Sequence, residues 1–261
     1  MRILQLLAAL FKVNVQLTMA YRADTVVNIL LNLFWLGLEL LGINIIFSNT
    51  NNLGGWGFGE LIALLGVFRL VNALMAALIF PNTQEFNTAV RNGTFDYTLL
   101  LPANSMFLVT FSRMVIWRVW DVLLGSVLLV VGLHISHSQE HLVSLLSFLL
   151  LAVTGSIILY SLWIVMIAAT FWFVKFDNNV TILDALLATG RYPATVYPSW
   201  LRLIVTFVIP VAVATTIPLQ ALRGELSTAQ VLLYTAISGV AFLVASQVWK
   251  AGIRRYSSAS S

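Results

Sequence analysis

The sequence predicts an all-α protein that crosses a membrane six times. Hydrophobic residues make up 60% of the 261 residues and charged residues only 9%, whereas soluble domains carry about 25% charged residues. A helix that spans the hydrocarbon core needs about 20 mostly apolar residues. The stretches that meet this need are 25–47, 60–80, 105–133, 142–170, 201–222 and 228–249. The ten-residue alternating segments of a membrane β-barrel are missing.

The basic residues of the connecting loops predict the orientation of these spans. Cytoplasmic loops of membrane proteins carry an excess of Lys and Arg. Basic residues lie before the first span, between the second and third, between the fourth and fifth, and after the last (Arg2, Lys12, Arg22, Arg91, Lys175, Arg191, Lys250, Arg254 and Arg255). The opposite loops contain only Arg223. We therefore expect both termini to be cytoplasmic, in a plasma or inner membrane.

Residues 1–24 are expected to form an amphipathic helix at the cytoplasmic interface, before a membrane domain over 25–261. On a helix with about 100° per residue, Arg2, Gln5, Lys12 and Gln16 share one polar face. Lys12, Asn14 and Gln16 interrupt the apolar core that a signal peptide requires. The alternative is a basic start that only orients the first span.

Charged residues within the spans predict contacts between helices, because an ionisable group in the hydrocarbon usually faces protein or water. Glu39 and Arg69 lie about 21 Å and 16 Å from the cytoplasmic ends of their spans, at about 1.5 Å per residue. We expect them to form a buried ion pair that fixes packing, with a substrate or proton site as the alternative. Arg118 and Asp121 are three residues apart and are expected to pair on one helix face.

Other sequence patterns exclude several kinds of chemistry. The missing G-x-x-x-x-G-K-[ST] motif excludes a phosphate loop, and neither H-E-x-x-H nor G-x-S-x-G is present. The chain has no cysteine, which excludes disulfides. His134, His137 and His141 lie near Glu140 in an outer loop and could bind a metal, but a plain exposed loop is the preferred interpretation. We expect no catalytic residue, no metal and no bound cofactor.

A polar segment over residues 81–104 joins the second and third spans. Asn82 and Glu85 resemble a capping box, and Asn92-Gly93 is typical of a helix end. Phe86 and Val90 share one small apolar face. We expect a short amphipathic helix parallel to the membrane on its cytoplasmic side, followed by a second turn capped by Thr94. The alternative is a surface helix that only bridges two spans.

Two prolines predict an irregular fifth span. Pro210 and Pro218 each remove a backbone donor and bend or break a helix. Backbone groups freed in this way are tolerated in a membrane only where protein or a cavity satisfies them. We expect either a bent span with a re-entrant closure on the outer side or a simple packing kink.

Two passages resemble the type-2 ABC exporter permeases, a family of six-span membrane subunits. Residues 91–102, R-N-G-T-F-D-Y-T-L-L-L-P, follow the family pattern G-x-hydrophobic-D-x-x-L-L-x-P. Residues 191–218 match its Tyr-Pro, Pro-x-Trp-Leu-Arg and Phe-x-x-Pro series. One departure is Leu101, where relatives often carry Arg before the proline.

The resemblance implies the membrane permease subunit of an ATP-driven exporter. Two permease chains, identical or related, would form the pathway, and separate ATPase subunits would hold ATP and Mg. Residues 82–97 would form the coupling helix, with Phe86 and Val90 packed on the ATPase. Glu85, Arg91 and Asp96 would set the register, and Gly93 would end the helix. The alternatives are a scaffold or channel subunit without an ATPase and, less well supported, a membrane enzyme. No nucleic-acid partner is expected, and the sequence leaves the substrate open.

Overall fold

The computed structural model describes residues 3–20, 22–136, 142–173, 179–208 and 210–256, and it is built from helices. In this part of the chain, five helices are long and apolar enough to cross a membrane, and the number would be six if a bent helix pair counted as one span. The predicted fold class, a polytopic all-α membrane protein, is confirmed. The α-helices in chain order are α1 (Ile3–Ala20), α2 (Arg22–Asn49), α3 (Phe58–Leu74), α4 (Phe80–Arg91), α5 (Asp96–Leu99), α6 (Ser105–Phe111), α7 (Val119–Ile135), α8 (Leu142–Ala168), α9 (Asn179–Ala188), α10 (Ser199–Leu203), α11 (Val211–Ala214), α12 (Thr216–Leu222) and α13 (Thr228–Arg255).

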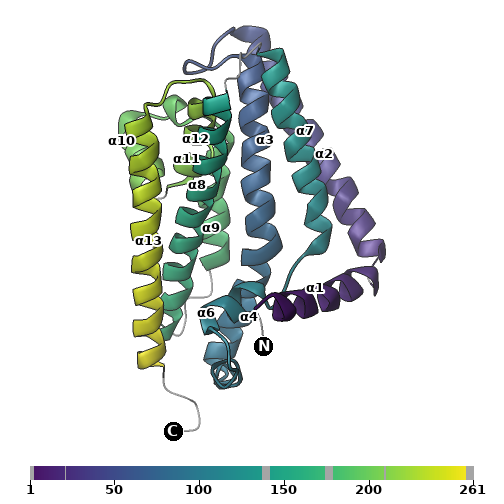
Figure 1. Cartoon of the computed structure of the whole chain (residues 1–261). Coiled ribbons are helices and arrows are strands. Elements are labelled where there is room, and N and C mark those ends of the chain that lie inside the picture. Colours follow the sequence, from purple (N-terminus) through teal and green to yellow (C-terminus); the bar gives the residue numbers. More distant parts are fainter. Residues whose placement is uncertain (1–2, 21, 137–141, 174–178, 209, 257–261) are drawn as a thin grey trace.

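Figure 1 shows the long helices side by side, with α1 lying across one end of them. That end, called the lower end here, also holds α4, α6 and the last turn of α13. The turn over residues 50–57, which joins α2 to α3, lies at the opposite, upper end. The expected helix over the first residues is therefore present, and α1 and the end of α13 lie at the same end of the molecule.

Small residues allow α3 and α7 to pack closely. A Cβ atom added to Gly66 of α3 would lie 2.5 Å from the Leu129 nitrogen, and one added to Gly132 of α7 would lie 2.3 Å from the Ala63 nitrogen. In a membrane, helices associate through such close backbone packing, because lipid is as apolar as the side chains themselves. The two helices therefore form a fixed pair.

The second crossing continues without interruption into the segment that was expected to be a separate helix. From α3 the chain passes through a π-helix over Met75–Ile79 into α4, and the whole helix Phe58–Arg91 has 34 residues. The expected capping box at Asn82 is wrong, because no helix begins there. The segment at 82–91 is the lower end of a long helix and not a separate helix laid along the membrane.

The third crossing begins later than expected. The predicted span over 105–133 is divided into α6, an unwound segment (residues 112–115), a 3₁₀ turn over Ile116–Arg118, and α7. Only residues 116–135 form a helix long enough to cross. The short α6 is a separate element at the lower end.

The region predicted as the fifth crossing enters and leaves at the same end. Helices Ser199–Thr206 and Val211–Leu222 meet at 65°. Just before them, the Thr195 hydroxyl donates to the Gly54 carbonyl at 2.7 Å, and just after them Arg223 pairs with Glu60 at 3.3 Å. Both partners lie at the upper end, so 199–222 is a re-entrant segment.

The return to the upper end is made by α9. Leu183 and Leu187 of α9 are buried in the same apolar cluster as Phe86 of α4 and Val71 of α3. Residues 189–191 then continue toward the upper end. The structure therefore differs from the prediction that Arg191 belongs to a loop at the cytoplasmic end, because it lies beside the middle of α2 and α3.

Candidate coupling site and intramembrane polar network

The predicted helix end at Asn92-Gly93 is present in the structure. Gly93 has a φ of 71°, a left-handed conformation that favours glycine. The Thr94 amide donates to the Ala89 carbonyl at 2.9 Å and the Gly93 amide to the Val90 carbonyl at 3.3 Å, the two bonds of a Schellman motif. The prediction that Thr94 caps the next turn is wrong, because α5 begins without a side-chain cap.

An aromatic cluster fixes the inner side of this turn. The cluster consists of Phe86, Phe95, Phe171, Trp249 and Tyr256, and neighbouring ring centroids are 5.2–6.2 Å apart. Edge-on ring pairs of this kind add about 0.5–1.5 kcal/mol each beyond the area they bury. The cluster ties α4 and the turn to the lower ends of α8 and α13.

Phe86 and Tyr256 are two members of the cluster whose burial has consequences for the site. Phe86 is only 3% exposed, so it packs inside this chain and does not provide the docking contact that was expected of it. Burial raises the pKa of the Tyr256 hydroxyl, and the nearby Asp96 carboxylate raises it further. An ordinary tyrosine is already neutral at physiological pH, and the raised pKa keeps the Tyr256 hydroxyl uncharged over a still wider pH range.

The outer side of the turn presents large apolar side chains to the surface. Tyr97 is 73% exposed and Leu100 is 80% exposed, and Leu101 lies beside them. We call residues 91–101 the coupling turn. Arg91 is exposed at its start, whereas Val90 and Asp96 are half-buried. Tyr97 and Leu100 were not among the predicted site residues, although apolar residues in a segment expected outside the lipid are a usable signal.

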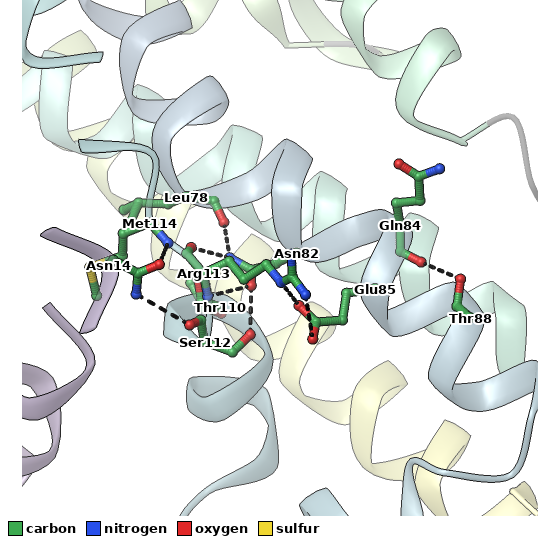
Figure 2. A network of polar contacts seen from close by, with 10 residues as sticks. All are labelled: Asn14, Leu78, Asn82, Gln84, Glu85, Thr88, Thr110, Ser112, Arg113 and Met114. Carbon is green, nitrogen blue, oxygen red and sulfur yellow. Dashed lines mark hydrogen bonds and ion pairs between the residues drawn. The ribbon is translucent and has the colours of Figure 1, made fainter. Parts of the chain in front are cut away.

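Asn82 lies at the centre of the polar network in Figure 2. Its side-chain oxygen accepts hydrogen bonds from the Ser112 hydroxyl at 2.6 Å and the Arg113 amide at 2.9 Å. Its side-chain nitrogen donates to the carbonyls of Leu78, Thr110 and Arg113. Since this nitrogen has two hydrogens, one of them is shared. A residue that is 1% exposed thus satisfies backbone groups that the unwound segment leaves without helical partners.

Asn14 of α1 binds the same unwound segment from the other side (Figure 2). Its oxygen accepts from the Met114 amide at 3.1 Å, and its nitrogen donates to the carbonyls of Leu10 at 2.8 Å and Ser112 at 3.4 Å. The two asparagines therefore join α1, α4 and the start of the third crossing. Glu85 pairs with Arg113 nearby at 2.5 Å, with side chains 45% and 63% exposed, so this pair adds little stability.

The structure brings Glu39 and Arg69 together. Their charged groups are 2.6 Å apart, with side chains 19% and 9% exposed. The second oxygen of Glu39 lies 3.6 Å from Arg191, whose guanidinium also stacks 5.5 Å from the Phe68 ring. Glu39 is thus shared by two arginines, one from α3 and one from the chain that leads into the re-entrant segment.

The network continues toward the lower end through a third helix. Arg69 donates to the Asn32 oxygen at 2.7 Å, and the Asn32 nitrogen donates to Asp121 at 2.5 Å. Arg118 pairs with Asp121 at 2.9 Å, as the three-residue spacing predicts, and stacks 4.3 Å from the Trp117 ring. The link between the Arg118–Asp121 pair and the Glu39–Arg69 pair was not predictable, because only the fold brings α2, α3 and α7 together.

The two prolines have different roles. Pro210 lies between the two helices of the re-entrant segment, where they bend by 65°. Pro218 lies in the first turn of α12, where a missing amide hydrogen removes no helical bond. The break before α12 falls at Thr215 instead. Pro218 therefore does not produce the kink that was expected of it.

The described residues contain no group of three or more side chains placed to hold a metal ion. His134 lies in the last turn of α7. His137, His141 and Glu140, which completed the predicted histidine cluster, lie outside the described residues.

The helices and the polar contacts between them define a polytopic α-helical membrane protein with a re-entrant segment. The chain matches the family described as ABC-2 family transporter protein over residues 33–260. It therefore belongs to the ABC-2 transporter family, and the resemblance found in the sequence is confirmed. No curated protein and no solved structure matches the chain.

Proposed function

We propose that this chain is the permease subunit of an ATP-driven exporter that works as a dimer with separate ATPase subunits. The observation that carries the proposal is the coupling turn. Its outer side exposes Tyr97 and Leu100 at one end of the protein, and its inner side is fixed to α4, α8 and α13 through the aromatic cluster. The exposed apolar side chains of the coupling turn can bind a partner protein, and the aromatic cluster behind them can pass a movement of that partner on to the membrane helices.

The charge distribution supports a cytoplasmic position for this end. Exposed basic residues gather at the lower end, where α1, the coupling turn and the last turns of α13 lie (Lys12, Arg91, Arg113, Lys250, Arg254 and Arg255). The turn over residues 50–57 at the upper end has no Lys or Arg. By the positive-inside rule, the lower end faces the cytoplasm, where ATP and its hydrolysing subunit are found.

The re-entrant segment supports a transport pathway closed from the outside. It enters and leaves at the upper end, and Pro210 lies at its bend. Irregular backbone at membrane depth is tolerated where it is buried in protein or lines a cavity. In the proposed cycle, this segment is the outer barrier of the pathway, and the coupling turn is where the ATPase acts.

The experiment purifies the tagged chain from its native membranes and measures a co-purified ATPase subunit and its vanadate-sensitive turnover. In the double variant Tyr97→Asp, Leu100→Asp, the amount of co-purified ATPase subunit should fall at least tenfold, because two charges replace an apolar contact. Asn51→Asp, an exposed position at the upper end, is the matched control and should change nothing. Undiminished association and turnover in the double variant would overturn the proposal.

A further inference from the structure

A large apolar cavity opens on the side of the protein, next to the Asn82 network, with which it shares Leu78 and Thr110. We call it the lateral groove. It has a volume of about 1230 Å³ and is lined by the π-helix at Met75–Ile79, by residues 101–104, and by α6, α8 and α13. Its walls include Leu78, Phe107, Leu149, Val153 and Phe242. This volume exceeds the roughly 300–1,000 Å³ of sites for drug-sized ligands, so the groove suits a long apolar ligand.

The groove lies along helices that cross the membrane, so it faces lipid. Leu149 and Val153 lie in the helix Leu142–Phe171 and Phe242 lies in Thr228–Arg255, both of which are long and apolar enough to cross a membrane. Leu149 is 52% exposed and Val153 is 59% exposed. The groove is therefore open to the hydrocarbon of the bilayer.

The hydroxyl groups of the groove are already bonded within the protein. The hydroxyls of Thr110 and Tyr160 bond each other at 2.8 Å. The Ser156 hydroxyl donates to the Ala152 carbonyl and the Ser238 hydroxyl to the Thr235 carbonyl, at 2.8 Å and 2.7 Å. A ligand thus gains little from these hydroxyls, and the part of it that lies against them must be apolar.

A cationic side chain lies below the groove on the same face of α13. Lys250 is exposed and follows the groove residue Gly239 by eleven residues, which is about three turns or roughly 16 Å along the helix. That length is close to the roughly 15 Å of one leaflet, half of the hydrocarbon core. Arg254 is one turn further and exposed. An acyl chain in the groove would therefore place its headgroup at a basic rim.

We infer that the lateral groove binds an anionic phospholipid of the leaflet at the lower end, with its acyl chains along α8 and α13 and its phosphate at Lys250. The concave apolar walls hold the acyl chains, and the ammonium group of Lys250 favours a lipid with an anionic headgroup. The inference does not depend on the ATPase partner, so it stands or fails separately from the proposed transport function.

The test uses the full chain in nanodiscs of phosphatidylcholine or of an equal mixture with phosphatidylglycerol, followed by native mass spectrometry of the lipid retained on release. Wild-type protein should retain phosphatidylglycerol in preference. Val153→Trp, which fills the groove, should lower total lipid retention at least tenfold. Val130→Trp is the control, because Val130 is a similarly exposed residue of α7 outside the groove. Leu149→Trp repeats the test from a second position if Val153→Trp melts early.

The headgroup is tested separately. Lys250→Gln should lower the preference for phosphatidylglycerol about fivefold, the effect of one lysine at an anionic surface, and leave phosphatidylcholine binding unchanged. Equal retention by Val153→Trp, Leu149→Trp and Val130→Trp would overturn the inference. So would an equal affinity of the wild-type protein for both lipids, or dissociation of a dimer by the groove variants, which would make the groove an interface between two copies.

Discussion

Removing the charge of Glu39 should destabilise the protein more than removing the charge of Arg69. Glu39→Gln leaves Arg69, whose side chain is 9% exposed, with only the Asn32 oxygen and with Arg191 as a like charge nearby. Leaving a buried charge without its partner costs about 3–5 kcal/mol. Arg69→Gln leaves Glu39 beside Arg191 at 3.6 Å, so the loss should be about 1.5–3 kcal/mol, the value of a charged hydrogen bond.

The double variant makes the prediction sharper. Glu39→Gln with Arg69→Gln leaves no buried charge at this point, and Arg191, whose side chain is 48% exposed, can turn to water. The double variant should therefore be more stable than Glu39→Gln alone. If the two sites were independent, the stability losses of the two single variants would instead add to within about 0.5 kcal/mol.

The assay is the free energy of unfolding in mixed micelles titrated with SDS. Arg113→Gln is the matched control, because it breaks the exposed pair with Glu85 and should cost less than about 1 kcal/mol. The reasoning is refuted if Arg69→Gln costs more than Glu39→Gln, or if the two single effects add. A control variant that costs as much as Glu39→Gln would also contradict it.

Two further predictions test the packing and the topology. Gly66→Leu should cost about 3 kcal/mol by overpacking, because a Cβ there would meet the α7 backbone at 2.5 Å. Gly37→Leu, where an added Cβ meets no atom within 4 Å, should not destabilise the protein, because it replaces a helix-interior glycine with a better helix former at an open position. Equal losses of stability in the two variants would contradict close α3–α7 packing. Since the chain has no cysteine, single cysteines can be labelled with an impermeant maleimide. Thr195→Cys and Asn51→Cys should react from one side of the membrane and Asn92→Cys from the other, and reaction of Thr195→Cys from the side of Asn92→Cys would refute the re-entrant segment.

The long uninterrupted spans could be predicted from the sequence because hydropathy and length alone determine them. Residues 25–47, 142–170 and 228–249 all lie within the observed α2, the α8 span and α13. The helix end at Gly93 was also predictable, since a left-handed residue after a helix is a local requirement. These features depend on a few neighbouring residues and on the solvent.

Asn82 shows why other features could not be predicted. Asparagine near the start of a polar segment is typical of a helix cap, because its side chain competes for nearby backbone groups. In the structure it bonds the carbonyls of Thr110 and Arg113 instead, about thirty residues further along the chain. The bonds exist only because the third crossing is unwound beside it, and no local pattern reveals that contact.

The fifth crossing was misplaced for a related physical reason. Hydropathy measures how many apolar residues a segment contains and not whether the chain returns to the side from which it entered. Residues 199–222 are apolar enough to span as a pair, but Thr195 and Arg223 fix both ends to the upper turn. Arg191 was assigned to a cytoplasmic loop because the sequence around it does not reveal its partner. That partner, Glu39, lies on α2, about 150 positions earlier.

The continuous second crossing changes how force would pass through the protein in the proposed cycle. A separate coupling helix could pivot at its own start, whereas α4 is joined to α3 in one helix whose most apolar window is 72% buried, against 11–33% for the other long helices. Its lower end carries the coupling turn, Arg69 in its middle contacts Glu39, and Glu60 at its upper end contacts Arg223 beside the re-entrant segment. A displacement of the coupling turn would therefore reach the outer barrier through one continuous helix. Within this helix, the π-helical turn at Met75–Ile79 departs from regular α-helical hydrogen bonding. Bending would therefore concentrate there, beside the lateral groove.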